Sequence, residues 1–398
     1  MDALVLSGGG AYGAYEVGVM KALFEGKVRA AGGAPDAGIF VGTSVGAFNA
    51  AVMAMQGDTD GLTAVGRLER IWLEKIAQQK GGSGNGVLRF RVDPLPYLNP
   101  MTVAVQPGRS ISGLVRDTMV LAQYGFDRGT AFFSSRHGIA SRAMELVDLA
   151  SLISVKPLRS TIAREISCER IRSSPKQLRI IATDWEHGVY RVFAGAEVTH
   201  EVVVASAAIP GVFPPVKFQN STYVDGGVTM NTPLKPAIEA GASTLHVISL
   251  DARLHPVPAS ELDCTLEALL RTFTIALASA IREDMATADW INRGIEALER
   301  AAAGAEVSSG ELRDFVRVAG QLERRARQEI GLRRIAVHHY HPREALGGPP
   351  GLLDFGRETL ATWMARGHAD AVAHDCKASG CVLPVQAPTA PPPAETPA

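Results

Sequence analysis

One serine of this chain lies in a pattern that suits nucleophilic chemistry. The stretch Gly42-Thr43-Ser44-Val45-Gly46 matches G-x-S-x-G and lies between an apolar run and a stretch with apolar residues at helical spacing. A serine on such a strand-to-helix turn exposes its hydroxyl, and the positive N-terminus of the following helix favours negative charge that develops there. The pattern predicts that Ser44 attacks a carbonyl carbon. A plain turn with a capping serine is the other interpretation.

Three consecutive glycines, Gly8-Gly9-Gly10, follow the first apolar run of the chain. Attack on an ester produces an oxyanion, which is stabilised by N–H donors that are already in position. A glycine run between a strand and a helix supplies several such donors. If the first two strands are neighbours in a parallel sheet, their turns emerge at one edge. The glycines would then line an oxyanion hole beside Ser44.

The same glycine loop fits a second pattern. Gly8-x-Gly10-x-x-Gly13 matches the dinucleotide-binding fingerprint, between a predicted strand and a predicted helix. That fingerprint expects an acidic residue at the end of the second strand to hold a ribose. Here the second strand ends in Gly42-Thr43-Ser44, so the acidic partner is missing and the pattern disfavours a dinucleotide site.

A serine nucleophile needs a base, which is usually a histidine. None of the ten histidines follows a strand in a recognisable motif; they include His137, His187, His200, His246, His255, His338, His339 and His341. Asp225-Gly226-Gly227 is different, because it follows the apolar Tyr223-Val224 and its glycines let the aspartate project from a tight turn. A desolvated aspartate with a raised pKa could take the proton directly. An ordinary turn is the alternative.

Several stretches occur in an order that resembles the patatin-like phospholipase family. They are LVLSGGGAYGAYEVGVMKAL (4–23), GTSVGAFNA (42–50), ASAAIPGVFPPV (205–216), YVDGGVTMNTPLKPAIEAGA (223–242) and LDFGRETLATWMARGHADA (353–371). The resemblance covers most of residues 1–375. It implies a three-layer α/β/α sandwich with a mainly parallel central sheet, and a Ser–Asp dyad without histidine. It also implies hydrolysis of fatty-acyl esters of lipids without a metal or other cofactor.

Carried over to this chain, the resemblance makes Ser44 the nucleophile, Asp225 the base and Gly8, Gly9 and Gly10 the oxyanion loop. Tyr12 departs from the family pattern G-G-G-x-R/K-G, which usually has a basic residue there. The departure puts in doubt any contact with an anion at this point, although the tyrosine hydroxyl could still donate a hydrogen bond.

The predicted elements that position these motifs are short apolar strands and amphipathic helices. Strands are expected over 3–7, 38–42, 178–193 (a hairpin around residues 186–188), 244–251 and 335–342, and helices over 15–26, 45–55 and 356–374. The stretch 199–216 is expected to be a strand that breaks at Pro210-Gly211. We expect a catalytic core over 1–255, with an irregular insertion or cap at about 80–175, a helical C-terminal portion over 256–380 and a disordered Pro/Ala-rich tail over 383–398.

Composition limits the partners and the compartment. With 40 basic and 41 acidic side chains the net charge is −1, which argues against nucleic acid as a partner. No signal peptide is visible and no stretch is long and apolar enough to span a membrane. We expect a cytoplasmic protein that acts at the periphery of a membrane on a lipid. The four cysteines form no disulfide framework; Cys376 and Cys381 could join His374 in an incomplete metal site, or be free thiols.

Three functional hypotheses follow from these observations. The first is a serine lipid acyl hydrolase of phospholipase A or lysophospholipase type that uses Ser44, Asp225 and an acyl-enzyme. The second is an α/β-hydrolase-type esterase or thioesterase, in which Ser44 needs a histidine and an acid. The third is a non-catalytic lipid-binding protein of the same fold. A reactive probe for the serine and substitutions of the histidines separate the three.

Overall fold

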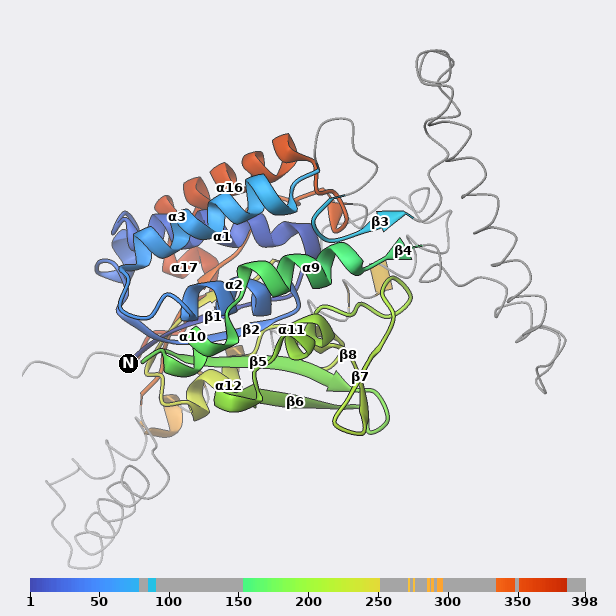
Figure 1. Cartoon of the computed structure of the whole chain (residues 1–398). Helices are drawn as coiled ribbons and strands as arrows, with labels where there is room; N and C mark the ends of the chain where they lie inside the picture. The colour runs from blue at the N-terminus through green and yellow to red at the C-terminus, as the bar shows by residue number, and fades with distance from the viewer. Residues whose placement is uncertain are drawn as a thin grey trace, which may run out of the picture.

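A computed structural model describes residues 1–78, 85–90, 153–250, 334–347 and 351–384, with short pieces between 271 and 295. Its centre is an eight-stranded sheet in the order β10-β9-β1-β2-β5-β8-β7, with β6 also paired to β5. Helices lie on both faces of this sheet (Figure 1). The described residues therefore confirm the predicted α/β/α layering.

The strands of the sheet are short. They are β1 (Asp2–Leu6), β2 (Ala37–Thr43), β5 (Gln177–Asp184), β6 (Val189–Ala194), β7 (Val216–Phe218), β8 (Ser221–Asp225), β9 (Thr244–Ile248) and β10 (Ala336–Tyr340). All pairings from β10 to β5 along the path are parallel, whereas β6, β7 and β8 pair antiparallel. A separate antiparallel pair joins β3 (Arg89–Phe90) to β4 (Ile153–Ser154).

Both faces of the sheet are buried, because successive residues of a strand point to opposite sides. In β1, Leu4 and Leu6 belong to a large hydrophobic core, while Ala3 and Val5 belong to a smaller one on the other face. This double burial explains why the strand sequences are apolar throughout rather than alternating.

Most helices cover the larger core. They are α1 (Gly13–Phe24), α2 (Val45–Ala54), α3 (Gly61–Ile71), α9 (Lys156–Glu165), α10 (Cys168–Ser173), α11 (His200–Ser206) and α16 (Arg357–Val372). A π-helical turn, Trp72–Ile76, continues α3. Helix α12 (Leu234–Glu239) covers the smaller core, and α17 (Cys376–Ser379) lies beyond the end of α16.

The first helix and the last long helix pack very closely. A Cβ atom added at Gly18 of α1 would lie 1.9 Å from the carbonyl oxygen of Met364, and one added at Gly367 of α16 would lie 2.1 Å from the carbonyl oxygen of Tyr15. The two glycines therefore let the two backbones approach each other. Figure 1 shows α16 lying beside α1 and α3.

The strands β2 and β8 meet head to head along the same edge of β5. Strand β2 runs parallel to β5 and ends where Thr43 pairs with Ile181. Strand β8 runs antiparallel to β5 and ends where Asp225 pairs with the next residue, Ala182. The turn after each strand therefore begins at one point of the sheet. The expected meeting of two turns is present, but it arises from opposed strands rather than from two parallel neighbours.

One predicted element is wrong. The stretch expected as a strand after residue 199 begins with helix α11, whose N-terminus is capped where the Thr199 hydroxyl accepts a hydrogen bond from the Val202 amide, 3.4 Å away. Three consecutive valines favour a strand in isolation. Here tertiary packing overrides that preference, since Val202 and Val203 are fully buried in the helical conformation.

The predicted domain boundaries fall partly outside the described residues. Of the expected insertion at 80–175, the described part after residue 152 consists mainly of α9 and α10, which pack on the core. Most of the expected helical portion before residue 334, and the tail from residue 385, lie outside the described residues. Strand β10 and helix α16 lie within the stretches 335–342 and 356–374, where a strand and a helix are expected. In the part of the chain that the structure describes, no helix combines the length and apolarity that a membrane crossing requires.

Candidate active site

Ser44 is the single residue between β2 and α2. Its backbone has φ 55° and ψ −123°, a positive-φ conformation outside the left-handed helical region that a residue with a side chain rarely adopts. The Ser44 amide donates a hydrogen bond of 2.9 Å to the Ser206 hydroxyl, which itself donates one of 2.5 Å to the carbonyl oxygen of Ile181. Ser206 therefore connects the turn at Ser44 to the central strand β5 through two hydrogen bonds.

The two glycines that flank Ser44 are required by close backbone contacts. A Cβ atom at Gly42 would lie 2.2 Å from the carbonyl oxygen of Gly46, and one at Gly46 would lie 2.4 Å from the carbonyl oxygen of Leu6. The G-x-S-x-G spacing thus reflects a sharp turn pressed against the end of β1.

Asp225 lies beside Ser44 and is almost completely buried, with 1% of its surface exposed. The Ser44 hydroxyl donates a 2.6 Å hydrogen bond to Asp225 Oδ2, and the Gly227 amide donates a 2.7 Å hydrogen bond to Oδ1. The backbone is fixed as well, since the Asp225 amide donates to the carbonyl oxygen of Ala208. Both carboxylate oxygens are therefore held in place.

Burial raises the pKa of Asp225 from its ordinary value of 3.8 to about 7. The two hydrogen bonds to the carboxylate oppose this shift, but they do not cancel the loss of hydration. A carboxylate with a pKa near neutrality is a much stronger base than an ordinary aspartate and still ionises at physiological pH.

The glycine loop lies next to this pair. A Cβ atom at Gly8 would lie 2.9 Å from Ser44 Cβ and 2.5 Å from Asn231 Oδ1, so only glycine fits there. Asn231 Oδ1 accepts a 2.9 Å hydrogen bond from the Gly8 amide. Among the described residues, no protein acceptor is bonded to the amides of Gly9 and Gly10. These two amides are therefore the ones that could donate to an oxyanion.

A family model described as a patatin-like phospholipase matches residues 4–238. The chain belongs to the patatin-like phospholipase family. A search of solved structures matches VipD from Legionella pneumophila with a TM-score of 0.34 and 14% sequence identity, over 91% of this chain and 66% of the VipD chain. This chain thus spans just under two thirds of VipD. None of the curated proteins matches the sequence.

Tyr12, where the patatin-like pattern has a basic residue, is a packing residue in this family member. It is 4% exposed, and its ring meets that of Trp363 edge-on at 4.8 Å between centroids. A Cβ atom at Gly351 would lie 2.3 Å from the Tyr12 hydroxyl oxygen, so the C-terminal segment is pressed onto this side chain. The tyrosine therefore joins the glycine loop to α16 and to the segment that precedes it.

The geometry disfavours a dinucleotide at the glycine loop of this patatin-like chain. The Ala11 amide donates a 2.9 Å hydrogen bond to the carbonyl oxygen of Leu352, and a Cβ atom at Gly10 would lie 2.3 Å from that oxygen. A pyrophosphate needs free amides and open space at the N-terminus of the following helix. Here the C-terminal segment fills that space.

The histidines of the described residues are engaged elsewhere. His137 and His255 lie outside the described residues, and the other eight have partners other than Ser44 and Asp225. His339 does contact a serine hydroxyl, at 2.7 Å, but that serine is Ser249. Within the described part of the chain, the Ser44 hydroxyl therefore has a carboxylate, not an imidazole, as its hydrogen-bond partner.

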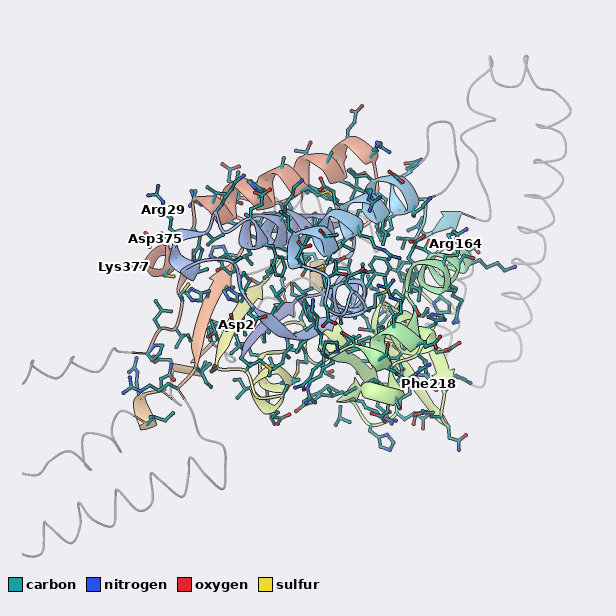
Figure 2. All side chains as sticks on the ribbon, turned by 60° about the vertical axis from the view of Figure 1, so that its left-hand side comes forward. Asp2, Arg29, Arg164, Phe218, Asp375 and Lys377 are labelled. Carbon is teal, nitrogen blue, oxygen red and sulfur yellow. The ribbon has the colours of Figure 1, made fainter. Side chains whose placement is uncertain are left out.

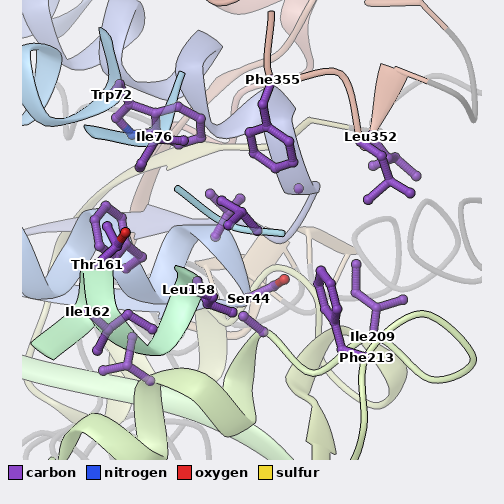
Figure 3. Close-up of a pocket in the computed structure, with 17 residues that line it drawn as sticks. Ser44, Trp72, Ile76, Leu158, Thr161, Ile162, Ile209, Phe213, Leu352 and Phe355 are labelled. Atoms are coloured by element: carbon purple, nitrogen blue, oxygen red, sulfur yellow. The ribbon is translucent and has the colours of Figure 1, made fainter. Parts of the chain in front are cut away.

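An apolar pocket opens at Ser44. Figure 3 shows Ser44 among the side chains of Trp72, Ile76, Phe213 and Phe355, which come from distant parts of the chain. Apart from Ser44, Thr161 is its one polar lining side chain among the described residues. The complete lining is Gly10, Ser44, Val45, Phe48, Trp72, Ile76, Val87, Leu158, Thr161, Ile162, Val203, Ala207, Ile209, Phe213, Leu352, Leu353 and Phe355.

A series of hydrogen bonds between buried polar side chains holds helix α2, which follows Ser44. Trp72 Nε1 donates a 2.9 Å hydrogen bond to Asn49 Oδ1, and Asn49 Nδ2 donates one of 2.8 Å to Glu16 Oε2. Burial raises the pKa of Glu16 well above its usual range, against the opposing effect of Asn49. These hydrogen bonds link α1, α2 and the π-helical turn, and so fix α2 behind Ser44.

Sequence reasoning missed Ser206, Asn231 and the pocket walls from the C-terminal segment. Ser206 and Asn231 lie inside two of the stretches that carry the family resemblance, ASAAIPGVFPPV and YVDGGVTMNTPLKPAIEAGA. Their presence in those stretches was the available signal. Phe355 lies in a third such stretch, LDFGRETLATWMARGHADA, whereas Leu352 lies outside all of them and had no comparable signal, since an isolated leucine is common in any core.

Proposed function

We propose that this chain is a serine lipid acyl hydrolase that cleaves fatty-acyl esters of phospholipids or lysophospholipids through a Ser44–Asp225 dyad. The observation that carries the proposal is the 2.6 Å hydrogen bond from the Ser44 hydroxyl to the buried Asp225 carboxylate, at an apolar pocket. Membership of the patatin-like phospholipase family supports a lipid acyl ester as the substrate class.

The proposed reaction begins when Asp225 takes the hydroxyl proton as Ser44 Oγ attacks the ester carbonyl carbon. The resulting oxyanion accepts hydrogen bonds from the amides of Gly9 and Gly10, close to the N-terminus of α2. When the tetrahedral intermediate collapses, Asp225 returns the proton to the departing alcohol oxygen. Water, deprotonated by Asp225, then attacks the acyl-enzyme, and Ser44 is released with its proton restored.

The pocket supports a fatty-acyl chain rather than a polar acyl group. Its lining offers aliphatic and aromatic side chains from six different segments and little that could bind a charged group. Since burial of each methylene contributes about 0.8 kcal/mol, an alkyl chain gains affinity in such a pocket with its length. A lipid of this kind is presented at a membrane surface, so we propose that the protein works at the periphery of a membrane.

A fluorophosphonate probe tests the activation of Ser44. We expect the probe to label the wild-type chain at Ser44 and to leave Ser44→Ala and Asp225→Asn unlabelled. Ser249→Ala is the matched control, because Ser249 is also buried and bonded to a potential base, His339. Loss of labelling in Ser249→Ala, with labelling retained in Asp225→Asn, would contradict the dyad and favour the Ser–His–Asp alternative.

Mass spectrometry of the products tests the substrate class. Incubation with a mixed lipid extract should release free fatty acids with the wild-type chain and none with Ser44→Ala. A folded wild-type chain that binds lipid but releases no fatty acid, and that the probe leaves unmodified, would instead favour a non-catalytic lipid-binding protein.

The pH dependence tests the role of Asp225 separately. Because the base must be ionised and its pKa is about 7, kcat/KM should fall about tenfold for each pH unit well below 7 and level off above it. A profile that stays flat between pH 5 and pH 8 would mean that a different group accepts the proton.

A further inference from the structure

Four side chains that can bind a soft metal lie together at the edge of the sheet. His338 belongs to β10, His374 follows α16, and Cys376 and Cys381 lie at the two ends of the last short turn of helix. Their ligand atoms all lie within 4.8 Å of one another. The sequence offered only three of them, since His338 lies 36 residues before His374.

The spacing of these atoms fits a tetrahedral zinc ion. With Zn–S bonds of about 2.3 Å and Zn–N bonds of about 2.05 Å, a sulfur and a nitrogen of a regular tetrahedron lie about 3.6 Å apart. Cys376 Sγ lies 3.5 Å from His338 Nδ1 and 3.5 Å from His374 Nε2, and Cys381 Sγ lies 3.3 Å from His374 Nε2. Three of the four sulfur–nitrogen edges therefore already have about the required length.

We propose that His338, His374, Cys376 and Cys381 form a Cys₂His₂ site for a structural zinc ion. Two thiolates and two imidazoles are a ligand set that zinc prefers, and four protein ligands leave no position for a substrate. The site is separate from the Ser44–Asp225 pair. Binding of zinc displaces the two thiol protons, so the cysteines act as thiolates.

The surroundings of the four ligands support this assignment. The His339 amide donates a hydrogen bond to Cys381 Sγ at 3.2 Å, which stabilises negative charge on the sulfur. His374 Nδ1 lies 3.3 Å from the Ser379 hydroxyl, which leaves Nε2 directed at the two sulfurs. Metal-binding histidines are commonly oriented in this way by a partner at the other ring nitrogen.

The loop geometry brings the two cysteines together. Asp375 caps α17, since its Oδ1 accepts a 2.9 Å hydrogen bond from the Lys377 amide. Gly380 ends the turn in a left-handed conformation with φ 71°, and the Cys381 amide then donates a 2.9 Å hydrogen bond to the carbonyl oxygen of Cys376. Figure 2 shows Asp375 and Lys377 at the surface of this end of the molecule, and three of the four ligand residues, His374, Cys376 and Cys381, are half-buried rather than buried.

A zinc ion here would fasten the end of the described chain to the outermost strand. Val337 and Val382 already exchange two backbone hydrogen bonds, of 2.7 and 3.0 Å, across an antiparallel bridge. Among the described residues, this isolated bridge pairs only Val337 on the side of β10 that faces away from β9. A metal that joins His338 to residues 374–381 would hold the covering segment in place and protect that edge from pairing with another chain.

Metal analysis of the whole chain, purified without a polyhistidine tag and kept reduced, tests the proposal. We expect one zinc per chain. After exchange of zinc for cobalt(II), we expect the thiolate-to-cobalt charge-transfer band and the strong d–d absorption of a tetrahedral site. Cys376→Ser and Cys381→Ser should each weaken cobalt binding at least tenfold and reduce the charge-transfer band. Cys168→Ser, which changes a thiol outside the cluster, should leave both unchanged.

Two metal-binding results would overturn the proposal, and so would a third result, a disulfide between the two cysteines. One is a reduced, folded wild-type chain that retains no zinc and gives no tetrahedral cobalt spectrum. The other is a cobalt spectrum that Cys376→Ser and Cys381→Ser leave unaltered. Because the wild-type spectrum itself reports thiolate ligation, the test holds even if a variant fails to fold. A Cys376–Cys381 disulfide that forms despite reductant would equally contradict a metal site.

Discussion

Replacement of Asp225 by asparagine should stabilise the fold at neutral pH while it removes activity. Asparagine fits the site, because its Oδ1 can accept from the Gly227 amide and its Nδ2 can donate to Ser44 Oγ. The substitution removes a buried group that must carry charge above pH 7. Stability and chemistry therefore make opposite demands on this one side chain.

The magnitude follows from the shift in the pKa of Asp225. In the unfolded chain the carboxyl ionises near 3.8, whereas in the folded chain it ionises near 7. Below pH 3.8 the Asp225 carboxyl is protonated in both states and does not change the free energy of unfolding. Between pH 3.8 and 7 it lowers the free energy of unfolding by about 1.4 kcal/mol for each pH unit. At pH 7 and above, the accumulated loss is about 4 kcal/mol, which Asp225→Asn does not suffer.

Urea unfolding of the wild type and Asp225→Asn at several pH values between 4.5 and 8.5 measures this effect. The difference in free energy of unfolding should grow with pH in favour of the variant and become constant above pH 7. Any packing change caused by the amide is independent of pH and shifts the whole curve. A difference that stays constant from pH 4.5 to 8.5 would refute the raised pKa.

Asp60→Asn is the matched control. Asp60 is an exposed N-cap whose pKa is lowered by hydrogen bonds from Thr63. Its carboxylate therefore stabilises the folded state above its unfolded pKa and loses that effect as the pH falls. That loss lies below pH 3.8, so the difference between the wild type and Asp60→Asn should stay constant between pH 4.5 and 8.5, where the difference for Asp225→Asn grows.

Three further substitutions test the positioning of the nucleophile. Gly8→Ala should reduce kcat at least tenfold and lower the thermal stability, because the new Cβ would lie 2.5 Å from Asn231 Oδ1. Steady-state kinetics, at a temperature where circular dichroism shows the variant to be folded, would show the loss of kcat. Gly66→Ala, in the middle of α3 with no atom within 4 Å of the new Cβ, should leave kinetics unchanged and stabilise the chain by up to about 1 kcal/mol in urea unfolding. Ser206→Ala leaves the buried Ser44 amide without its acceptor and should destabilise by about 1–3 kcal/mol, with a loss of kcat that Gly66→Ala does not show.

Short sequence patterns predicted much of the fold, because a glycine motif between an apolar run and a helical pattern indicates a turn between a strand and a helix. The glycines around Ser44 and the apolar runs of β1 and β2 read directly as strand, turn and helix, and the structure has them. The meeting of Ser44 with Asp225 could not be derived from spacing. It depends on β2 and β8 ending at adjacent residues of β5. Only the family resemblance suggested that two residues 181 positions apart act together.

The failures of prediction share one cause, which is tertiary context. The three valines of α11 favour a strand, and burial between the neighbouring elements turns them into a helix. His338 could not be joined to Cys376 from sequence, since only the position of β10 at the edge of the sheet brings them together. The closure of the pocket by Leu352 was equally invisible, because it depends on how the last segment folds back onto the glycine loop.

The residues that follow the family-matched portion complete the central sheet and the pocket. The match ends at residue 238, yet β9 and β10 complete the sheet beyond β1, and Leu352 and Phe355 form part of the pocket wall. A fragment cut at the end of the match would bare the edge of β1, strip α16 from α1 and open the pocket to water. The family match over residues 4–238 is thus shorter than the part of the chain that must fold together, which extends at least to the end of α16. Fragments for expression should include the longer part.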